Sequence, residues 1–237
     1  MMHAPADILK FHDVTIVPDS ESGLGLSKLN STLAAGDLAL VLLAPEQARI
    51  PLADAAEGLV KPEQGTGTFL GEDWQTMTVD RVMRQRGRIG RVFEGESWLS
   101  DLYVDKNITL AQRHHTRRDK KEIEAEAIEL CHVFGLPELP RGWPSSLQGQ
   151  DLQKAACVRA FLGAPVLLLL ENPTRGVYAD LIAPLMKTVN DARRRGAAVL
   201  WTTNEPGVWN QPELRATVRY RMRGSPMQVM EAAERAA

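Results

Sequence analysis

Residues 147–174 constrain the fold of this chain more than any other stretch. They read LQGQDLQKAACVRAFLGAPVLLLLENPT, which is a polar turn, a helical pattern, a short loop and a run of aliphatic residues. A short aliphatic run between turn signals is typical of a strand that is covered on both faces of its sheet. The stretch therefore predicts a helix over Asp151–Leu162 and a buried strand over Val166–Leu170.

Similar aliphatic runs recur along the chain and alternate with helical patterns. Leu38–Leu43 reads LALVLL, which predicts a central strand, and Ala197–Thr202 predicts another. Further strands are predicted over Ile8–Val17, Gly67–Leu70 and Ile89–Phe93, and further helices over Ile50–Val60, Asp119–Phe134 and Leu181–Arg195. Such alternation predicts an α/β fold with a largely parallel sheet. Residues 94–110 are expected to form an apolar-rich loop, and the tail after Gly224 is expected to fray or form a helix.

The composition narrows the class of protein. With 237 residues the chain can bury a full core, so we expect a single domain over residues 1–237. A net charge of −2 gives no basic excess for nucleic acid as a partner. Cys131 and Cys157 both fall in apolar helical patterns, as expected of buried thiols in a reducing compartment.

The sequence also bears on membrane, metal and anion binding. No apolar run approaches the roughly 18–20 residues that cross a membrane, and the first residues, MMHAPADILKF, lack the pattern of a secretion signal. We therefore expect a soluble, cytoplasmic protein whose link to a membrane comes through a partner. The histidines lack metal-ligand spacing, so no metal site is expected. The basic stretch Arg113–Lys121, which contains His114 and His115, is either a patch for phosphate or anionic lipid or a solvated helical face.

Two polar turns frame residues 147–174 and carry a resemblance. Leu147–Asp151 reads LQGQD, where ABC-type ATPases have a signature of LSGGQ type, and Glu171–Thr174 reads ENPT, where they have DEPT. From about Ile8 to Arg223, the order and spacing of five such motifs resembles an ABC transporter nucleotide-binding domain. The resemblance implies a P-loop NTPase-like fold, with a mixed sheet core and a helical subdomain inserted over approximately residues 95–162. The layout is also similar to the ATPases of Mce-associated lipid-trafficking systems.

The phosphate loop of that family aligns with Leu43–Pro51, LAPEQARIP. A working loop needs G-x-x-x-x-G-K-[ST], because glycines let backbone N–H groups approach phosphate, Lys neutralises charge and a hydroxyl holds Mg²⁺. Here Arg49 stands at the Lys position, Ala48 at a glycine position, and Glu46 would point a negative charge at phosphate. The resemblance therefore implies a vestigial nucleotide pocket, and the alternative is an ordinary strand-to-helix turn. The residues of the vestigial pocket would be Glu46, Gln47, Ala48, Arg49, Ile50, Glu94, Gln148 and Gly149.

The other motifs also differ from the family at their reactive positions. Glu94 stands where the family has a Gln that contacts Mg²⁺ and the attacking water, and a carboxylate there can still bind metal. Glu171 replaces the Asp of the Mg²⁺ shell. Asn172 replaces the Glu that acts as general base, and Asn cannot accept a proton at neutral pH. Asn204 replaces the His that senses the γ-phosphate. The resemblance thus implies degenerate equivalents of the catalytic residues and no catalytic residue.

The loop Glu94–Tyr103, EGESWLSDLY, contains large apolar side chains. The resemblance implies that this loop helps to form the groove that receives a coupling helix from a membrane subunit, and exposed apolar side chains suit such docking. The candidate docking residues are Trp98, Leu99, Leu102 and Tyr103. The alternative, packing beneath the helical subdomain, is equally compatible with the sequence.

Three hypotheses about function follow. The first is a pseudo-ATPase, a structural or regulatory subunit of a membrane transport complex that needs no cofactor. Its partners would be a membrane-spanning transporter subunit, a second ABC subunit or both, at the inner face of the cell membrane. The second is a weakly active ATPase that uses ATP and Mg²⁺, with Arg49 and Glu171 substituting for their family counterparts, although the loss of several cooperating groups costs orders of magnitude in rate. The third is a cytosolic scaffold that reuses the fold outside transport.

Overall fold

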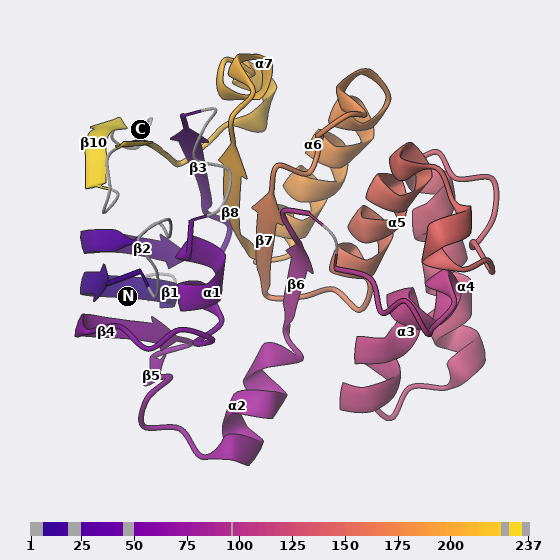
Figure 1. Cartoon of the computed structure of the whole chain (residues 1–237), viewed down its shortest axis with the longest axis horizontal. Helices are drawn as coiled ribbons and strands as arrows, with labels where there is room; N and C mark the ends of the chain where they lie inside the picture. Colours follow the sequence, from indigo (N-terminus) through magenta and orange to yellow (C-terminus); the bar gives the residue numbers. More distant parts are fainter. Residues whose placement is uncertain (1–6, 19–24, 45–49, 96, 224–227, 234–237) are drawn as a thin grey trace.

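The structure, a computed structural model, describes residues 7–18, 25–44, 50–95, 97–223 and 228–233. Over these residues the chain forms a six-stranded sheet, a four-stranded sheet and helices packed against them (Figure 1). The predicted α/β fold is therefore confirmed. Within the same residues, no helix is both long and apolar enough to cross a membrane.

The six-stranded sheet has the strand order β10-β9-β3-β8-β7-β6. Its strands are β3 (Leu38–Leu43), β6 (Ile89–Val92), β7 (Leu167–Glu171), β8 (Ala198–Thr203), β9 (Val218–Arg223) and β10 (Gln228–Ala233). All neighbours run parallel except β10, which pairs antiparallel with β9. The prediction of a largely parallel sheet is confirmed. The expectation of a frayed or helical tail is wrong, since pairing with β9 overrides the helical composition of QVMEAA.

The central strands divide the core between the two faces of this sheet. Leu38 and Leu40 of β3 pack into a cluster with the helices on one face, whereas Ala39 and Val41 pack into a second cluster on the other face. The same alternation holds along β7 and β8. Because both faces are covered, uninterrupted aliphatic sequence is what these strands require.

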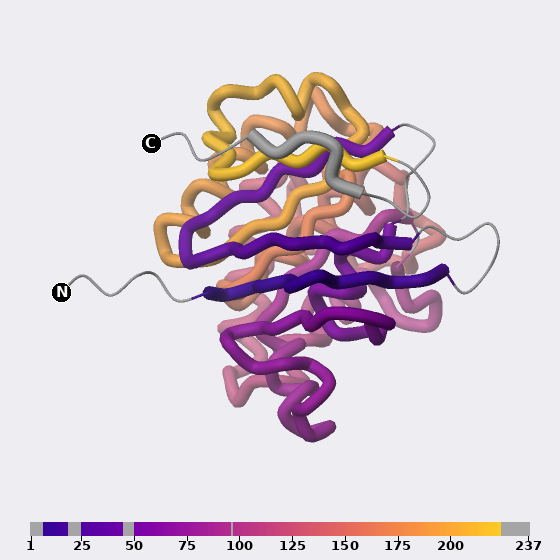
Figure 2. Tube along the Cα trace, turned by 90° about the vertical axis from the view of Figure 1, so that its left-hand side faces the viewer, coloured from indigo at the N-terminus to yellow at the C-terminus, as the bar shows by residue number. Residues whose placement is uncertain are grey.

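A four-stranded antiparallel sheet lies over the second cluster, with the order β2-β1-β4-β5. Its strands are β1 (Asp7–Ile16), β2 (Leu26–Ala34), β4 (Gln64–Phe69) and β5 (Glu72–Asp73). Figure 2 shows β1, β2 and β4 side by side in front of the parallel strands. The short helix α1 (Leu52–Ala56) shares the second cluster with both sheets. The sequence predicted two of these strands, over Ile8–Val17 and Gly67–Leu70, but not their pairing in a separate sheet, because β1 pairs with β4, a strand distant from it in sequence.

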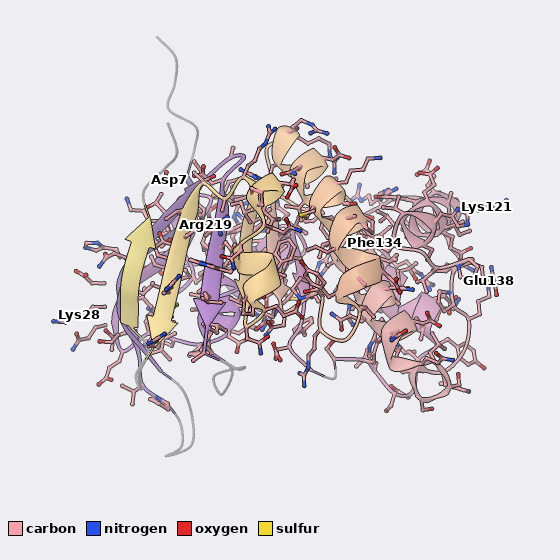
Figure 3. The ribbon with its side chains drawn as sticks, turned by 90° about the horizontal axis from the view of Figure 1, so that it is seen from above. Asp7, Lys28, Lys121, Phe134, Glu138 and Arg219 are labelled. Atoms are coloured by element: carbon pink, nitrogen blue, oxygen red, sulfur yellow. The ribbon has the colours of Figure 1, made fainter. Side chains whose placement is uncertain are left out.

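The helices fall into two groups. A helical layer at one end of the molecule consists of α3 (Val104–His115), α4 (Lys120–Val133) and α5 (Gly149–Phe161), with a 3₁₀ turn at Pro144–Ser146 before α5 (Figure 1). Seen from above, Lys121 and Glu138 mark the outer end of this layer, and Asp7 and Lys28 lie at the opposite end of the molecule (Figure 3). The remaining helices are α2 (Val79–Arg86), α6 (Tyr178–Arg194), α7 (Pro206–Trp209) and a 3₁₀ turn at Pro212–Leu214.

The expectation of a loop over residues 94–110 is wrong in its second half, because α3 begins at Val104. The buried face of α3 carries several polar residues, Asp105, Asn107, Thr109 and Gln112, beside Val104 and Ile108. This mixture hides the apolar period by which a helix is detected in sequence.

Candidate functional site

The ends of three strands meet at the carboxyl edge of the parallel sheet and carry four polar residues. Glu94 follows β6, Glu171 ends β7 and Asn172 follows it, and Asn204 follows β8. Parallel strands bring their carboxyl ends to one edge, which is where open α/β sheets place ligands. The structure thus brings together these four residues, which the sequence analysis had singled out.

Asn172 joins the ends of three strands. Its side-chain Nδ2 donates to a carboxylate oxygen of Glu94, and its Oδ1 accepts from the backbone N–H of Asn204 at 2.9 Å. Its own backbone N–H donates to the carbonyl of Thr202 at 2.9 Å. The residue is buried with a φ of 42°, a left-handed conformation that Asn tolerates better than most residues. Both ends of the amide are therefore engaged within the chain.

The Glu94 carboxylate has a second partner. Its Oε1 accepts from Nη1 of Arg175 at 2.9 Å, and the side chain is only 5% exposed. Amide and guanidinium donors thus occupy both oxygens of this carboxylate.

Arg91 of β6 binds three carboxylates, which we call the acid cluster: Asp54, Glu57 and Glu171. Its Nε donates to Oε2 of Glu171 at 2.8 Å, and its Nη1 donates to Asp54 and Glu57, both at 2.7 Å. The side chains of Arg91 and Glu171 are 8% and 12% exposed. The cluster links α1, β6 and β7 directly beside Asn172.

Burial sets the electrostatics of the acid cluster. Burial raises the pKa of both Glu57 and Glu171, and hydrogen bonds and charge from Arg91 oppose that effect without cancelling it. Burial by itself would lower the pKa of Arg91, but its bond to Glu171 and the charges of Glu57 and Glu171 raise it above its ordinary value. The charged form of the Arg91 guanidinium is therefore stabilised, whereas burial disfavours the charged forms of Glu57 and Glu171.

Most of the predicted phosphate loop cannot be placed. Glu46, Gln47, Ala48 and Arg49 lie outside the described residues. Ile50 is described and buried in the second core cluster, and Pro51 precedes α1 without a side-chain cap.

The signature-like turn lies across a groove from Phe93, the residue that precedes Glu94. The groove is open, has a volume of about 720 Å³, and is lined by Phe93, Trp98, Gln148, Gly149, Gln153 and Arg175 among others. Nε2 of Gln153 donates to the carbonyl of Pro173 at 2.8 Å, which ties α5 to the segment after β7. Gln148 and Gly149 are exposed at the start of α5. The structure thus places them at the groove.

A stack of arginines and aromatic rings connects the acid cluster to the helical layer. The guanidinium of Arg91 lies 4.4 Å from the ring centroid of Phe93, and that of Arg159 lies 5.4 Å from the same centroid. Arg159 also lies 4.5 Å from the ring of Trp98 and donates to the carbonyl and hydroxyl of Ser97. Burial lowers the pKa of Arg159 to about 10, so the group stays charged at neutral pH. Each such cation–π contact stabilises by about 0.5–2 kcal/mol.

The predicted docking residues divide between packing and exposure. Trp98 is half-buried and packs against Arg159 and the core, while Leu99 and Tyr103 are 48% and 43% exposed. Leu102 is half-buried. The ring of Tyr103 lies 4.2 Å from that of Trp143, which is also exposed. Part of the loop therefore packs against the core and part of it exposes apolar side chains, and docking of a partner there stays a prediction.

Asn107 of α3 fixes the shape of this loop. Its Oδ1 accepts from the N–H of Leu99 at 2.9 Å, and its Nδ2 donates to the carbonyls of Leu99, Leu102 and Tyr103 at 3.1, 3.0 and 3.2 Å. These bonds satisfy backbone groups of Leu99, Leu102 and Tyr103, while the side chains of Leu99 and Tyr103 stay exposed.

Sequence reasoning missed five residues that shape the site: Arg91, Asn107, Trp143, Arg159 and Arg175. An arginine at Arg91, inside an aliphatic strand pattern, was a usable signal, because a charge buried in a strand needs partners. Trp143, Arg159 and Arg175 gave no comparable signal, because their partners are distant in sequence. Asn107 gave none because its partners are backbone groups of a loop.

Comparisons with known proteins agree with this fold. The chain is 32% identical over 125 residues to the octopine permease ATP-binding protein P of Rhizobium meliloti, a match that covers 53% of this chain and 48% of that protein. It is 25% identical over 182 residues to the glutamate/aspartate import ATP-binding protein GltL of Escherichia coli K12, which covers 77% of this chain and 75% of that protein. The chain therefore spans about half to three quarters of these relatives. No family model matches.

Solved structures resemble the whole chain. A dimeric bacterial ABC transporter cassette superposes with a TM-score of 0.84 at 18% identity, covering 96% of this chain and 98% of that one. The same cassette in a post-hydrolysis state, described as bound to ADP and Pi, superposes with a TM-score of 0.83 at 18% identity. At this identity the likeness establishes the ABC cassette fold.

Proposed function

Because this chain is a homologue of ABC transporter ATP-binding proteins, we propose that it is a non-hydrolysing subunit of a membrane transport complex. In this proposal it is a structural or regulatory partner that binds a membrane-spanning subunit, a second ABC subunit or both. The names of its relatives, a permease component and an import protein, favour an import system at the inner face of the cell membrane.

The observation that carries the proposal is the internal pairing of the carboxylates at the sheet edge. Mg²⁺ requires oxygen ligands in near-octahedral geometry. Oε2 of Glu171 accepts from Arg91, and the two carboxylate oxygens of Glu94 accept from Asn172 and Arg175, so three of these four oxygens already have a donor within the chain. Among the described residues, no group of three or more His, Cys, Asp and Glu can hold a metal ion. The residues present do not fit Mg²⁺.

The reactive positions support the same proposal. Asn172 and Asn204 stand at the positions of the base and the switch histidine of the family, and the side-chain Oδ1 of Asn172 accepts from the backbone N–H of Asn204. The sequence of residues 43–51 lacks the glycines, Lys and hydroxyl by which a phosphate loop binds triphosphate. ATP and Mg²⁺ are therefore expected as cofactors only under the alternative, a weakly active transporter ATPase.

The groove and the loop beside it are the proposed docking surface for the membrane partner. Leu99 and Tyr103 present apolar area on a loop whose backbone is fixed by Asn107. Large apolar and aromatic side chains on a preformed surface are typical of interface hot spots.

The catalytic part of the proposal is tested by ATP turnover. The purified chain, alone and in complex with a co-purified membrane subunit, is expected to release phosphate from Mg-ATP no faster than its Glu171→Gln variant. Rapid hydrolysis that is lost in Arg49→Ala or Glu171→Gln would establish the weakly active alternative instead.

The docking part is tested by a matched pair of exposed leucines. Leu99 and Leu110 are 48% and 44% exposed, but Leu110 lies on α3 outside the loop. Leu99→Asp is expected to remove at least nine tenths of the membrane subunit that co-purifies in detergent, and Leu110→Asp to leave it unchanged. Equal effects of the two variants, or retention of the subunit by Leu99→Asp, would contradict this surface, and a stable chain without any membrane subunit would favour a scaffold outside transport.

A further inference from the structure

We propose that the guanidinium of Arg91 is a built-in substitute for a divalent cation, and that it neutralises the acid cluster without a bound metal. The inference deepens the proposed function and rests on it, because it takes Glu171 to stand where the family has a metal-shell carboxylate. It explains why this position is still an acid. It concerns the nucleotide-free chain, so it can be tested without ATP.

The acid cluster has the ligand types of a metal site but not its arrangement. Asp54 and Glu57 come from α1 and its C-terminal end and Glu171 from the end of β7, and all three lie around the guanidinium of Arg91. In this arrangement they form no group, among the described residues, that could hold a metal ion. Clustered carboxylates repel one another and need a cation to remain charged. Oxygen ligands of this kind suit Mg²⁺, Ca²⁺ and Mn²⁺.

The point where they converge is already filled by a positive charge. Arg91 reaches all three carboxylates through Nε and Nη1 at 2.7–2.8 Å, and the ring of Phe93 covers one face of the guanidinium. A planar fork of donors can bind several carboxylates from fixed directions, which an ammonium cannot do equally well. A metal ion and the guanidinium therefore compete for the same oxygens.

The charge balance shows what the cation does. Three carboxylates outnumber the one guanidinium, and burial already raises the pKa of Glu57 and Glu171. Removing one partner of a buried ion pair leaves the others uncompensated, which is far more damaging than removing a surface charge. Without Arg91 the acid cluster must take up protons, or bind another cation, or separate.

The first test measures metal binding by the chain as it is. Mn²⁺ is titrated into the purified chain without nucleotide, and free Mn²⁺ is followed by its EPR signal. With the native chain, the signal of free Mn²⁺ is expected to follow the added Mn²⁺ without loss up to about 1 mM, which is the weak end of the affinity range of carboxylate sites. Binding of one ion per chain below that concentration, abolished in Glu171→Gln, would overturn the proposal.

The second test opens the site. Arg91→Ala is expected to lower Tm by about 10 °C, as for other broken buried ion pairs in chains of this size, and to gain one Mn²⁺ site that binds at least tenfold more tightly than in the native chain. Saturating Mn²⁺ should restore at least half of the lost Tm. Arg88→Ala is the control, because it removes an exposed arginine just before the same strand. It should change Tm by no more than about 2 °C and should not change Mn²⁺ binding.

Two further results decide the matter. If Arg91→Ala folds but binds no Mn²⁺, or if it is as stable as Arg88→Ala, the guanidinium is not acting as the cation of this cluster. If Arg91→Ala does not fold, Arg91→Lys takes its place: it retains a positive charge and is expected to fold, with a lower Tm than the native chain and no Mn²⁺ site. An Mn²⁺ site in Arg91→Lys would contradict the proposal.

These outcomes are separable from those of the proposed function. A chain that hydrolyses ATP yet excludes Mn²⁺ in the absence of nucleotide contradicts the proposed function and leaves the role of Arg91 intact. A chain that does not hydrolyse ATP but binds Mn²⁺ through Glu171 contradicts the role of Arg91 and leaves the absence of hydrolysis in the proposed function intact.

Discussion

Hydrogen bonds of single side chains connect the strands at the carboxyl edge of the sheet, and Asn172 connects three of them. It links the ends of β6, β7 and β8 through Glu94, its own backbone and Asn204. Its amide supplies a donor to one neighbour and an acceptor to the other, which neither a carboxylate nor an aliphatic side chain can do. The residue therefore stabilises the site through its shape and polarity together.

Replacing Asn172 separates these contributions. Asn172→Ala is expected to cost about 2–4 kcal/mol of unfolding free energy, because it leaves buried polar partners unsatisfied and forces Ala into a left-handed conformation. Asn172→Gly loses the same bonds without that conformational strain, so it should be more stable than the Ala variant by about 1 kcal/mol. Urea unfolding of the three chains measures both differences, and equal stability of the Ala and Gly variants would contradict the strained geometry.

The pH dependence of stability reports on the acid cluster. Burial raises the pKa of Glu57 above its ordinary value of 4.5, so the folded chain holds this proton more tightly than the unfolded chain. Its contribution is therefore fully present below pH 4.5 and is lost as pH rises through the raised pKa. Glu57→Gln lacks that loss, so its stability relative to the native chain should increase with pH.

Unfolding free energies of the native chain and of Glu57→Gln, measured at several pH values between about 5 and 8, check this expectation. The exposed Glu63, changed to Gln, is the surface control. If the unfolding free energy of Glu57→Gln relative to the native chain stays constant or decreases with rising pH, burial does not raise the pKa of Glu57.

At the scale of elements, the contact between β6 and α5 positions the groove. A Cβ atom at Gly90 would lie 1.8 Å from the carbonyl oxygen of Ala160, so the strand lies directly on the helix. This close approach brings Arg159 of α5 to the rings of Phe93 and Trp98. Only glycine allows it.

Gly90→Ala is expected to destabilise the chain by about 3 kcal/mol or more, which is about 10 °C in Tm for a chain of this size. Gly149→Ala is the matched control, because a Cβ there meets nothing within 4 Å. Thermal unfolding followed by circular dichroism measures both. A Gly90→Ala chain as stable as the Gly149→Ala chain would contradict the close packing of β6 on α5.

The elements that sequence predicted well are those with one dominant signal. β3, β7 and β8 are aliphatic because both of their faces are buried, and α4 follows an apolar period between Asp119 and Gly135. Two strands of the antiparallel sheet were predicted, but their pairing was not, because strand pairing depends on residues distant in sequence. α3 was missed because polar residues lie on its buried face, and β10 because pairing with β9 outweighs its helical composition. At the site, sequence predicted which residues stand at the strand ends, but not their partners, since Arg91 and Arg159 act across long sequence separations.

At the scale of the whole molecule, the fold of an ABC cassette is complete while the groups at its sheet edge are bonded to one another. The boundaries of a helical subdomain over residues 95–162 stay a prediction, although α3, α4 and α5 do form a layer of their own. A chain with this architecture can present a preformed partner surface without a ligand.

Nucleotide is therefore expected to leave global stability unchanged. A ligand at 100 times its Kd stabilises a protein by about 2.7 kcal/mol, which is several degrees in Tm. Millimolar Mg-ATP should shift the Tm of this chain by less than about 1 °C, as measured by calorimetry, with ATP in excess EDTA as the control. A shift of several degrees that requires Mg²⁺ would support the weakly active ATPase instead.

The bond between Asn172 and Glu94 makes these two positions depend on each other. Glutamate at position 172 would set two acids face to face where an amide now donates to a carboxylate. Glutamine at position 94 would leave Arg175 without the carboxylate that it now binds. Each single change is therefore expected to destabilise the site, and only an exchange at both positions together would keep an amide opposite a carboxylate.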